Sequence, residues 1–199
     1  MSDDLMAPPK PLALVVSDFD GVLNRRDQWV KYDEVRRHRT LRRANYVAWC
    51  ATRMLDAAMV GRLARLCVEG DAHLVISSSW RDEYDLFEFA DMLGVHGFPR
   101  ERVLGKIGRE GAGHGNRGEA IRRWIHLAGN DVRAHVILDD RTHEEGIEGL
   151  TVVRTDTDVG LTDRDVERAL AILRGEHLHT LGWDANGAPV WEMPPTTSR

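Results

Sequence analysis

The stretch VVSDFDGVLN, residues 15–24, decides the fold of this chain. It closes a short, valine-rich apolar run that begins at residue 12, and such a run predicts a fully buried strand. Asp18 and Asp20 follow, and because side chains alternate along an extended chain, both point to the same side. Two carboxylates held this close repel each other unless a cation lies between them or one of them keeps a proton. The stretch therefore predicts a cation site or an acid–base pair.

Apolar strands alternate with amphipathic helices along the rest of the chain. The pattern predicts further strands at residues 73–76, 132–138 and 150–153, and helices over 54–68, over 83–94, from Arg117 and from an N-cap at Thr162. Strands that are apolar on both faces indicate an α/β domain whose parallel sheet is covered by helices on both faces. Sites in such sheets lie beyond the carboxyl ends of the strands, where this chain has three polar clusters: Asp18/Asp20, Ser77–Ser79 and Asp139/Asp140.

The composition bounds the class of protein. The chain has 199 residues, 42% hydrophobic and 30% charged, which is ordinary for one soluble globular domain. No apolar run reaches the ~20 residues of a membrane span, the acidic, proline-rich start is not a signal peptide, and two isolated cysteines indicate reduced thiols. We therefore expect a cytoplasmic protein with no membrane contact. Its expected parts are a flexible start (1–11), one domain (12–175) and an extension (176–199) with a hairpin around Ala185–Gly187 before a disordered end.

A basic segment follows the aspartate pair. Residues 24–43 hold eight Lys or Arg against three Asp or Glu, a net +5, although the whole chain carries −5. The segment could attract a polyanion, with Arg36 and Arg37 as substrate contacts, or it could be a solvated surface. Its aromatic neighbours could stack on single-stranded nucleic acid or form the core of a small cap: Trp29, Tyr32, Tyr46 and Trp49. The insertion at 24–53 has room for only a helix or two, which predicts an open site.

Four motifs in a fixed order resemble the haloacid dehalogenase-like (HAD) superfamily. They are DFDGVLN, a strand ending in SSSWR, RGEAI opening a helix, and a strand ending in DDR, and the resemblance covers residues 12 to 173. More narrowly, LVISSSWR, RGEAIRRWI, VILDD and TDTDVGLT resemble the HAD domains of "Swiss Army knife" RNA-repair proteins and the phosphatase half of phage polynucleotide kinases. The resemblance implies a Rossmann-like HAD fold with a small helical insertion after the first strand.

The resemblance also implies a chemistry. Asp18 would attack phosphorus and form an aspartyl-phosphate, while Asp20 would protonate the leaving oxygen and then activate water. Mg²⁺ would lie between Asp18, the backbone carbonyl of Asp20 and Asp139, with Asp140 at or next to the ion. A serine would donate to a phosphoryl oxygen: counting back from the Trp-Arg pair favours Ser78, but Ser77 and Ser79 stay open.

The lysine of the superfamily's third motif has two candidates here. Lys106 follows a short apolar segment, whereas Arg117 opens a helix whose N-terminus favours an anion. We favour Arg117, because arginine keeps its proton and binds phosphate through two nitrogens. Arg81 and Arg141 are further candidates for substrate contacts, although Arg81 could simply pack at the surface and Arg141 could pair with an acidic neighbour.

These residues favour a Mg²⁺-dependent phosphatase that acts on a nucleic-acid terminus, with a 3′-phosphate as the expected group. A phosphatase of free nucleotides or other small phosphoesters is the alternative enzyme. An inactive HAD fold used as a binding module is the alternative of another class, and the intact aspartates argue against it. A phosphorylated nucleic-acid end or nucleotide is the expected partner, together with a repair kinase or ligase.

Overall fold

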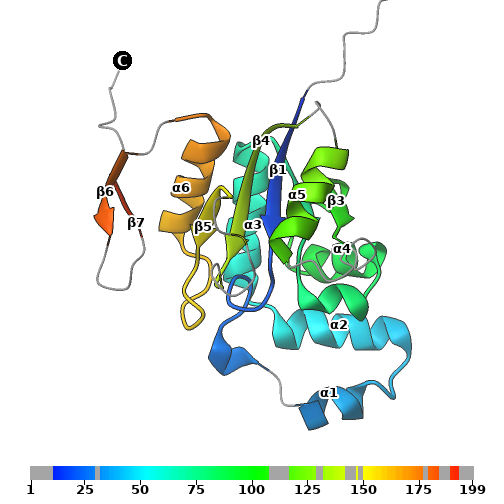
Figure 1. Cartoon of the computed structure of the whole chain (residues 1–199). Helices are drawn as coiled ribbons and strands as arrows, with labels where there is room; N and C mark the ends of the chain where they lie inside the picture. The colour runs from blue at the N-terminus through cyan, green and yellow to red at the C-terminus, as the bar shows by residue number, and fades with distance from the viewer. Residues whose placement is uncertain are drawn as a thin grey trace, which may run out of the picture.

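Five short apolar segments form one parallel sheet in the order β3-β2-β1-β4-β5, as the computed structural model of the chain shows (Figure 1). The strands are β1 (Leu12–Ser17), β2 (Ala72–Ile76), β3 (Val103–Lys106), β4 (Val132–Asp139) and β5 (Val152–Arg154). The structure describes residues 11–29, 32–107, 117–128, 132–141, 147, 150–176, 179–183 and 189–192. The predictions for the chain start, the hairpin turn at Ala185–Gly187 and the chain end concern residues outside the described ranges.

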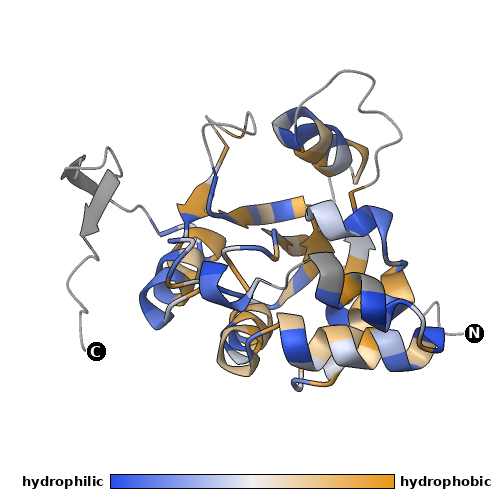
Figure 2. Ribbon diagram, turned by 90° about the horizontal axis from the view of Figure 1, so that it is seen from below, coloured by the Kyte–Doolittle hydropathy of each residue, from blue (hydrophilic) through white to orange (hydrophobic). Residues whose placement is uncertain are grey.

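Helices cover both faces of the sheet, as predicted. α3 (Ala57–Glu69), α4 (Leu86–Gly94) and α6 (Asp163–Leu173) pack on one face, and α5 (Arg117–Leu127) covers the other (Figure 2). The alternation along β1 divides its side chains between the two cores: Ala13 and Val15 face the first group of helices, whereas Leu14 and Val16 face α5. The parallel α/β fold is therefore confirmed.

Local signals set several helix ends. Thr162 caps α6, accepting from the N–H of Asp165 at 3.2 Å while the Asp165 carboxylate accepts from the Thr162 N–H, so the predicted cap is confirmed. Asp56 caps α3, with its carboxylate accepting from the N–H groups of Ala58 and Met59. In the described part of the chain, no helix has the length and the apolar content needed to cross a bilayer.

One strand was not predicted. The sequence indicates only a short apolar segment before Lys106, since β3 has four residues and contains Gly105; the structure places this strand, partly buried, at the edge of the sheet. Short 3-10 turns, η2 (Ser79–Asp82) and η3 (Arg100–Arg102), also precede α4 and β3. Near the chain end, β6 (His179–Trp183) pairs antiparallel with β7 (Pro189–Glu192), where the sequence predicts a hairpin.

The insertion after β1 contains η1 (Arg26–Gln28), α1 (Tyr32–His38) and α2 (Arg43–Met54), and α2 packs against α4. Its aromatic residues do not act as one group. Tyr46 is buried in the core, and Trp49 stacks on His38 with ring centres 4.0 Å apart, so these two form the interior of the insertion. Trp29 remains 44% exposed.

Two arginines of the basic segment are paired within the chain. Arg43 donates from Nε and Nη2 to the carboxylate of Glu88 at 2.5 and 2.7 Å, and its guanidinium lies 5.2 Å from the ring centre of Tyr84. Arg39 donates to Glu83 at 2.6 Å. The +5 charge is thus partly neutralised by acidic residues of the η2–α4 region.

Arg43→Ala should lower the free energy of unfolding by about 1–2 kcal/mol, because it removes a two-point ion pair and a cation–π contact that join α2 to α4. Urea unfolding followed by circular dichroism measures the change. Arg42→Ala is the matched control, since Arg42 is the exposed neighbour and its side chain does not cap α2. Equal losses in the two variants would contradict a joining role for Arg43.

Candidate active site

The carboxyl ends of three central strands meet in one row. Ser17, the last residue of β1, is level with Ile76 of β2 and Leu138 of β4. The next residue of each strand therefore falls in one row: Asp18, Ser77 and Asp139. Val16, two positions earlier on β1, packs in the core on the α5 side, so the row faces α5. The register of the sheet brings these polar groups together.

Arg117 joins the two aspartates of the row. Its Nη1 atom donates to Asp18 Oδ2 at 2.7 Å and to Asp139 Oδ2 at 2.5 Å. All three side chains are nearly inaccessible, with exposed fractions of 6%, 2% and 1%. Burial lowers the pKa of Arg117, but the two carboxylates outweigh it and the pKa is raised, so the guanidinium stays charged. Burial also raises the pKa of Asp139 to about 6, although Arg117 opposes this.

Lys106 lies outside this row. It is level with Ile76, one position before Ser77, so alternation turns its side chain to the other face of the sheet. There Nζ donates to the backbone carbonyls of Arg81 and Tyr84, at 3.0 and 2.7 Å. Lys106 therefore holds the turn after β2, and the geometry favours Arg117 as the cation next to Asp18.

Asp140 completes a buried group of three carboxylates with Asp18 and Asp139, whose oxygen atoms lie within 4.8 Å of one another. Thr157 donates to Asp140 Oδ2 at 2.6 Å, whereas Oδ1 is buried and has no hydrogen-bond partner among the described residues. Gly21 makes room for this carboxylate: its φ is +73°, and a Cβ atom there would overlap the Asp140 side chain. The sequence motifs do not predict the contact between Thr157 and Asp140.

The side chain of Asp20 is not part of the cluster of three carboxylates, because it is held by other partners. Asn24 Nδ2 donates to Asp20 Oδ1, and Trp80 Nε1 donates to Oδ2, both at 3.0 Å. Burial raises the pKa of Asp20, the two hydrogen bonds oppose this, and the negative charge of Asp18 adds to it. The result is a partly buried carboxyl group that favours its protonated form more than an exposed aspartate does.

The structure places the three serines differently from what the motif spacing favours. Ser78 is buried, and its hydroxyl accepts from the N–H of Trp80 at 3.3 Å as the cap of η2. Ser77 lies in the row with Asp18, and its buried hydroxyl has no hydrogen-bond partner within the described ranges. Ser79 is exposed. The geometry therefore favours Ser77 over Ser78 for a contact with a group bound at Asp18.

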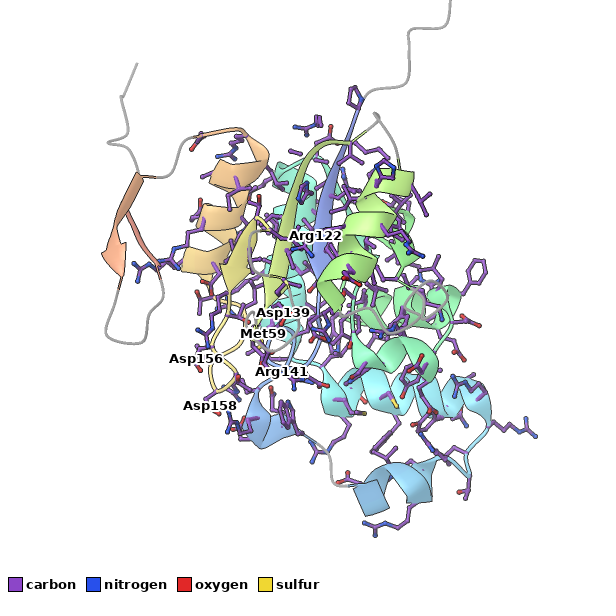
Figure 3. The ribbon with its side chains drawn as sticks, viewed as in Figure 1. Met59, Arg122, Asp139, Arg141, Asp156 and Asp158 are labelled. Carbon is purple, nitrogen blue, oxygen red and sulfur yellow. The ribbon has the colours of Figure 1, made fainter. Side chains whose placement is uncertain are left out.

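The other predicted substrate contacts lie at different depths. Arg81 donates from Nη1 to the carbonyl of Ser78 at 3.2 Å. Arg141 is 44% exposed, and its Nε lies 3.7 Å from Asp140 Oδ1; Figure 3 shows it near Asp139 at the lower end of the sheet, beside the loop with Asp156 and Asp158. Arg37 is exposed on α1, and the side chain of Arg36 lies outside the described part of the structure.

Asn24 is the residue that motif reasoning missed most clearly. It is 1% exposed, and its side chain makes four hydrogen bonds: Nδ2 donates to Asp20 and to the carbonyl of Met54, and Oδ1 accepts from Gly21 N–H and Trp29 Nε1. An uncharged residue directly after DFDGVL was the available signal, but nothing in the local sequence predicts partners thirty residues away.

This sheet order, with an Asp-x-Asp turn after the first strand, an arginine from a helix start and an aspartate pair after a fourth strand, defines a HAD-like domain. The chain belongs to the family described as the HAD domain in Swiss Army Knife RNA repair proteins, whose model matches residues 14–166. Comparison with curated proteins found no match, and comparison with solved structures found none either.

Arg117→Ala should lower the turnover of a generic phosphomonoester at least about tenfold, because it leaves two buried carboxylates unpaired beside the reacting group. Lys106→Ala should leave turnover within about threefold and mainly lower the melting temperature, since it releases two carbonyls of a turn. Steady-state kinetics and thermal unfolding of both variants, with Arg117→Lys as a conservative substitution, measure the two effects. A larger kinetic loss for Lys106→Ala would contradict the assignment.

Proposed function

We propose that this chain is a Mg²⁺-dependent phosphomonoesterase that uses an aspartyl-phosphate intermediate to remove a terminal 3′-phosphate from a polynucleotide during nucleic-acid repair. The observation that carries the proposal is the buried group of Asp18, Asp139 and Asp140, joined by Arg117 at the carboxyl ends of β1 and β4. Membership in a HAD family of RNA-repair proteins supports both the chemistry and the class of substrate.

The residues present fit a magnesium ion. Three buried carboxylates face one buried guanidinium, that of Arg117, while the exposed Arg141 reaches Asp140 only at 3.7 Å, so the group keeps an excess of negative charge that a divalent cation would balance. Asp140 Oδ1 is buried and has no hydrogen-bond partner within the described ranges, so it offers an oxygen donor of the kind Mg²⁺ prefers. Asp18, Asp139 and Asp140 would hold the ion, and when bound it would neutralise charge on the phosphoryl oxygens.

Asp18 would act as the nucleophile. Its Oδ1 accepts the N–H of Phe19 at 2.6 Å and its Oδ2 accepts from Arg117, so the carboxylate is fixed in orientation. An oxygen of Asp18 would bond to phosphorus as the bond to the leaving oxygen breaks. Ser77 and Arg117 would donate to the phosphoryl oxygens, because both lie beside Asp18.

Asp20 would act as the general acid and then as the general base. In the first step, protonated Asp20 would give its proton to the leaving oxygen. In the second step, the resulting carboxylate would accept a proton from the water that cleaves the aspartyl-phosphate. The raised pKa favours the protonated form required for the first step. The donors Asn24 and Trp80 hold the carboxyl group in place through both oxygens.

Phosphate release should need Mg²⁺ or a similar divalent ion and should stop in excess chelator. Asp18→Asn should abolish turnover, because an amide is a poor nucleophile, while Cys67→Ser, a conservative change in the core of α3, should retain it. Malachite-green detection of phosphate from β-glycerophosphate measures both effects. Full activity of Asp18→Asn, or full activity in chelator, would exclude the proposed mechanism, whereas no phosphate release by the unmodified chain with Mg²⁺ would favour the binding-module alternative.

A 3′-phosphorylated oligonucleotide should give a higher kcat/KM than a 5′-phosphorylated one or a free mononucleotide. The advantage should fall steeply with salt, because binding of a polyanion releases counterions. The triple change Arg36→Gln, Arg37→Gln and Arg42→Gln should reduce it while β-glycerophosphate hydrolysis stays the same; Arg43 is left intact because it joins α2 to α4. Equal or better rates on mononucleotides, insensitive to salt, would instead favour a phosphatase of free nucleotides.

A further inference from the structure

A cavity of about 220 Å³ lies beside Asp20, and none of the three clustered carboxylates forms part of its wall. Its walls are formed by side chains of the Asp-x-Asp turn, the insertion and η2: Asp20, Asn24, Gln28, Trp29, Met54 and Trp80. It is smaller than the roughly 300–1,000 Å³ of sites for drug-sized ligands, so it suits one ring system and not a whole nucleotide chain. In the proposed reaction Asp20 protonates the leaving oxygen, so this cavity lies on the leaving-group side.

The amide side chains of the cavity are already engaged. All four hydrogen bonds of Asn24 go to neighbouring groups of the chain. Gln28 Oε1 accepts from the N–H of Arg25 at 2.9 Å, and its Nε2 donates to Asp56 at 3.2 Å. A ligand that enters the cavity therefore meets few free groups that could distinguish one hydrogen-bonding edge from another.

Apolar and aromatic surfaces remain for binding. Trp29 is held at its edge, where Nε1 donates to Asn24 Oδ1 at 3.1 Å, yet 44% of the residue is exposed. Trp80 is likewise anchored through Nε1 to Asp20, and Met54 adds a thioether. An indole that is fixed in place and open to solvent is suited to stack on a flat ring without regard to the ring's substituents.

We propose that this cavity is a subsite for the nucleobase of the leaving group, which stacks on Trp29 irrespective of base identity. The inference rests on the proposed function, because Asp20 defines the leaving-group side. It deepens that function by naming the substrate as a nucleoside phosphate with an unpaired base. Tyr46 and Trp49 do not share this role, since both pack inside the insertion.

The test measures binding by calorimetry with Mg²⁺, in an Asp18→Asn background that cannot turn the ligand over. The probes are 3′-phosphorylated dinucleotides with each of the four bases at the 3′ position, and one whose 3′ nucleotide is abasic. The four bases should bind within about threefold of one another, and the abasic probe roughly 5- to 150-fold more weakly, the range expected for one stacked base.

Variants then assign the effect to Trp29. Trp29→Ala should weaken the base-containing probes to the level of the abasic one and leave the abasic probe unchanged, and Trp29→Phe should restore most of the loss. Phe87→Ala, which removes an aromatic residue that is 81% exposed on α4 and absent from the cavity wall, should change nothing. Equal binding of abasic and base-containing probes, or a preference above about tenfold for one base, would overturn the subsite.

The two proposals can fail separately. If the wild-type chain hydrolyses β-glycerophosphate but binds the abasic probe as well as the others, the phosphatase stands and the subsite is wrong. If no phosphomonoester is hydrolysed but the Trp29-dependent loss persists, the cavity is a base-binding site and not a leaving-group subsite, and the phosphatase is wrong. A free 3′-mononucleotide, used as a further probe, distinguishes a polynucleotide end from a free nucleotide as the ligand. A subsite for polynucleotide ends should bind the mononucleotide more weakly than the dinucleotide.

Discussion

The contact of one arginine with two aspartates is the constraint on which the rest of the site depends. Arg117, Asp18 and Asp139 come from three separate elements and are all nearly inaccessible to water. Buried charges are stable only when they are paired, so the start of α5 must lie against the ends of β1 and β4. The same contact fixes one oxygen of Asp18, and the three carboxylates still carry an excess of negative charge.

The parallel sheet decides which nearby polar residues can take part. Neighbouring strands with a fixed register present every second residue to the same face, so a single position separates a residue in the site from one behind it. Ser77 is level with Asp18, whereas Lys106 is level with the preceding position and supports the turn that carries Trp80. Chemical suitability alone does not distinguish these candidates.

The sequence was sufficient for the alternation of strands and helices, the Thr162 cap and the meeting of Asp18 with Asp139, because these follow from local patterns and from the geometry of parallel sheets. It was insufficient where the exact end of a strand decides which residue faces the site, as for Ser77 and Ser78. It was also insufficient where partners are distant: Arg43 meets Glu88 across forty-five positions, and Asn24 meets Met54 across thirty. A run of arginines in the sequence therefore suggests a free basic surface, although some of these side chains form ion pairs within the chain.

Asn24 contacts the acid Asp20, the turn residue Gly21, the exposed Trp29 and the end of α2 at Met54 through one amide group. Because the same amide group makes these hydrogen bonds, a change in the shape of the neighbouring cavity also changes the orientation of Asp20. A lineage of such domains that changed its ligand by altering this wall would therefore alter its acid at the same time. Divergence among relatives should proceed more readily through Met54 and Gln28, where a side chain can change without releasing the carboxyl group.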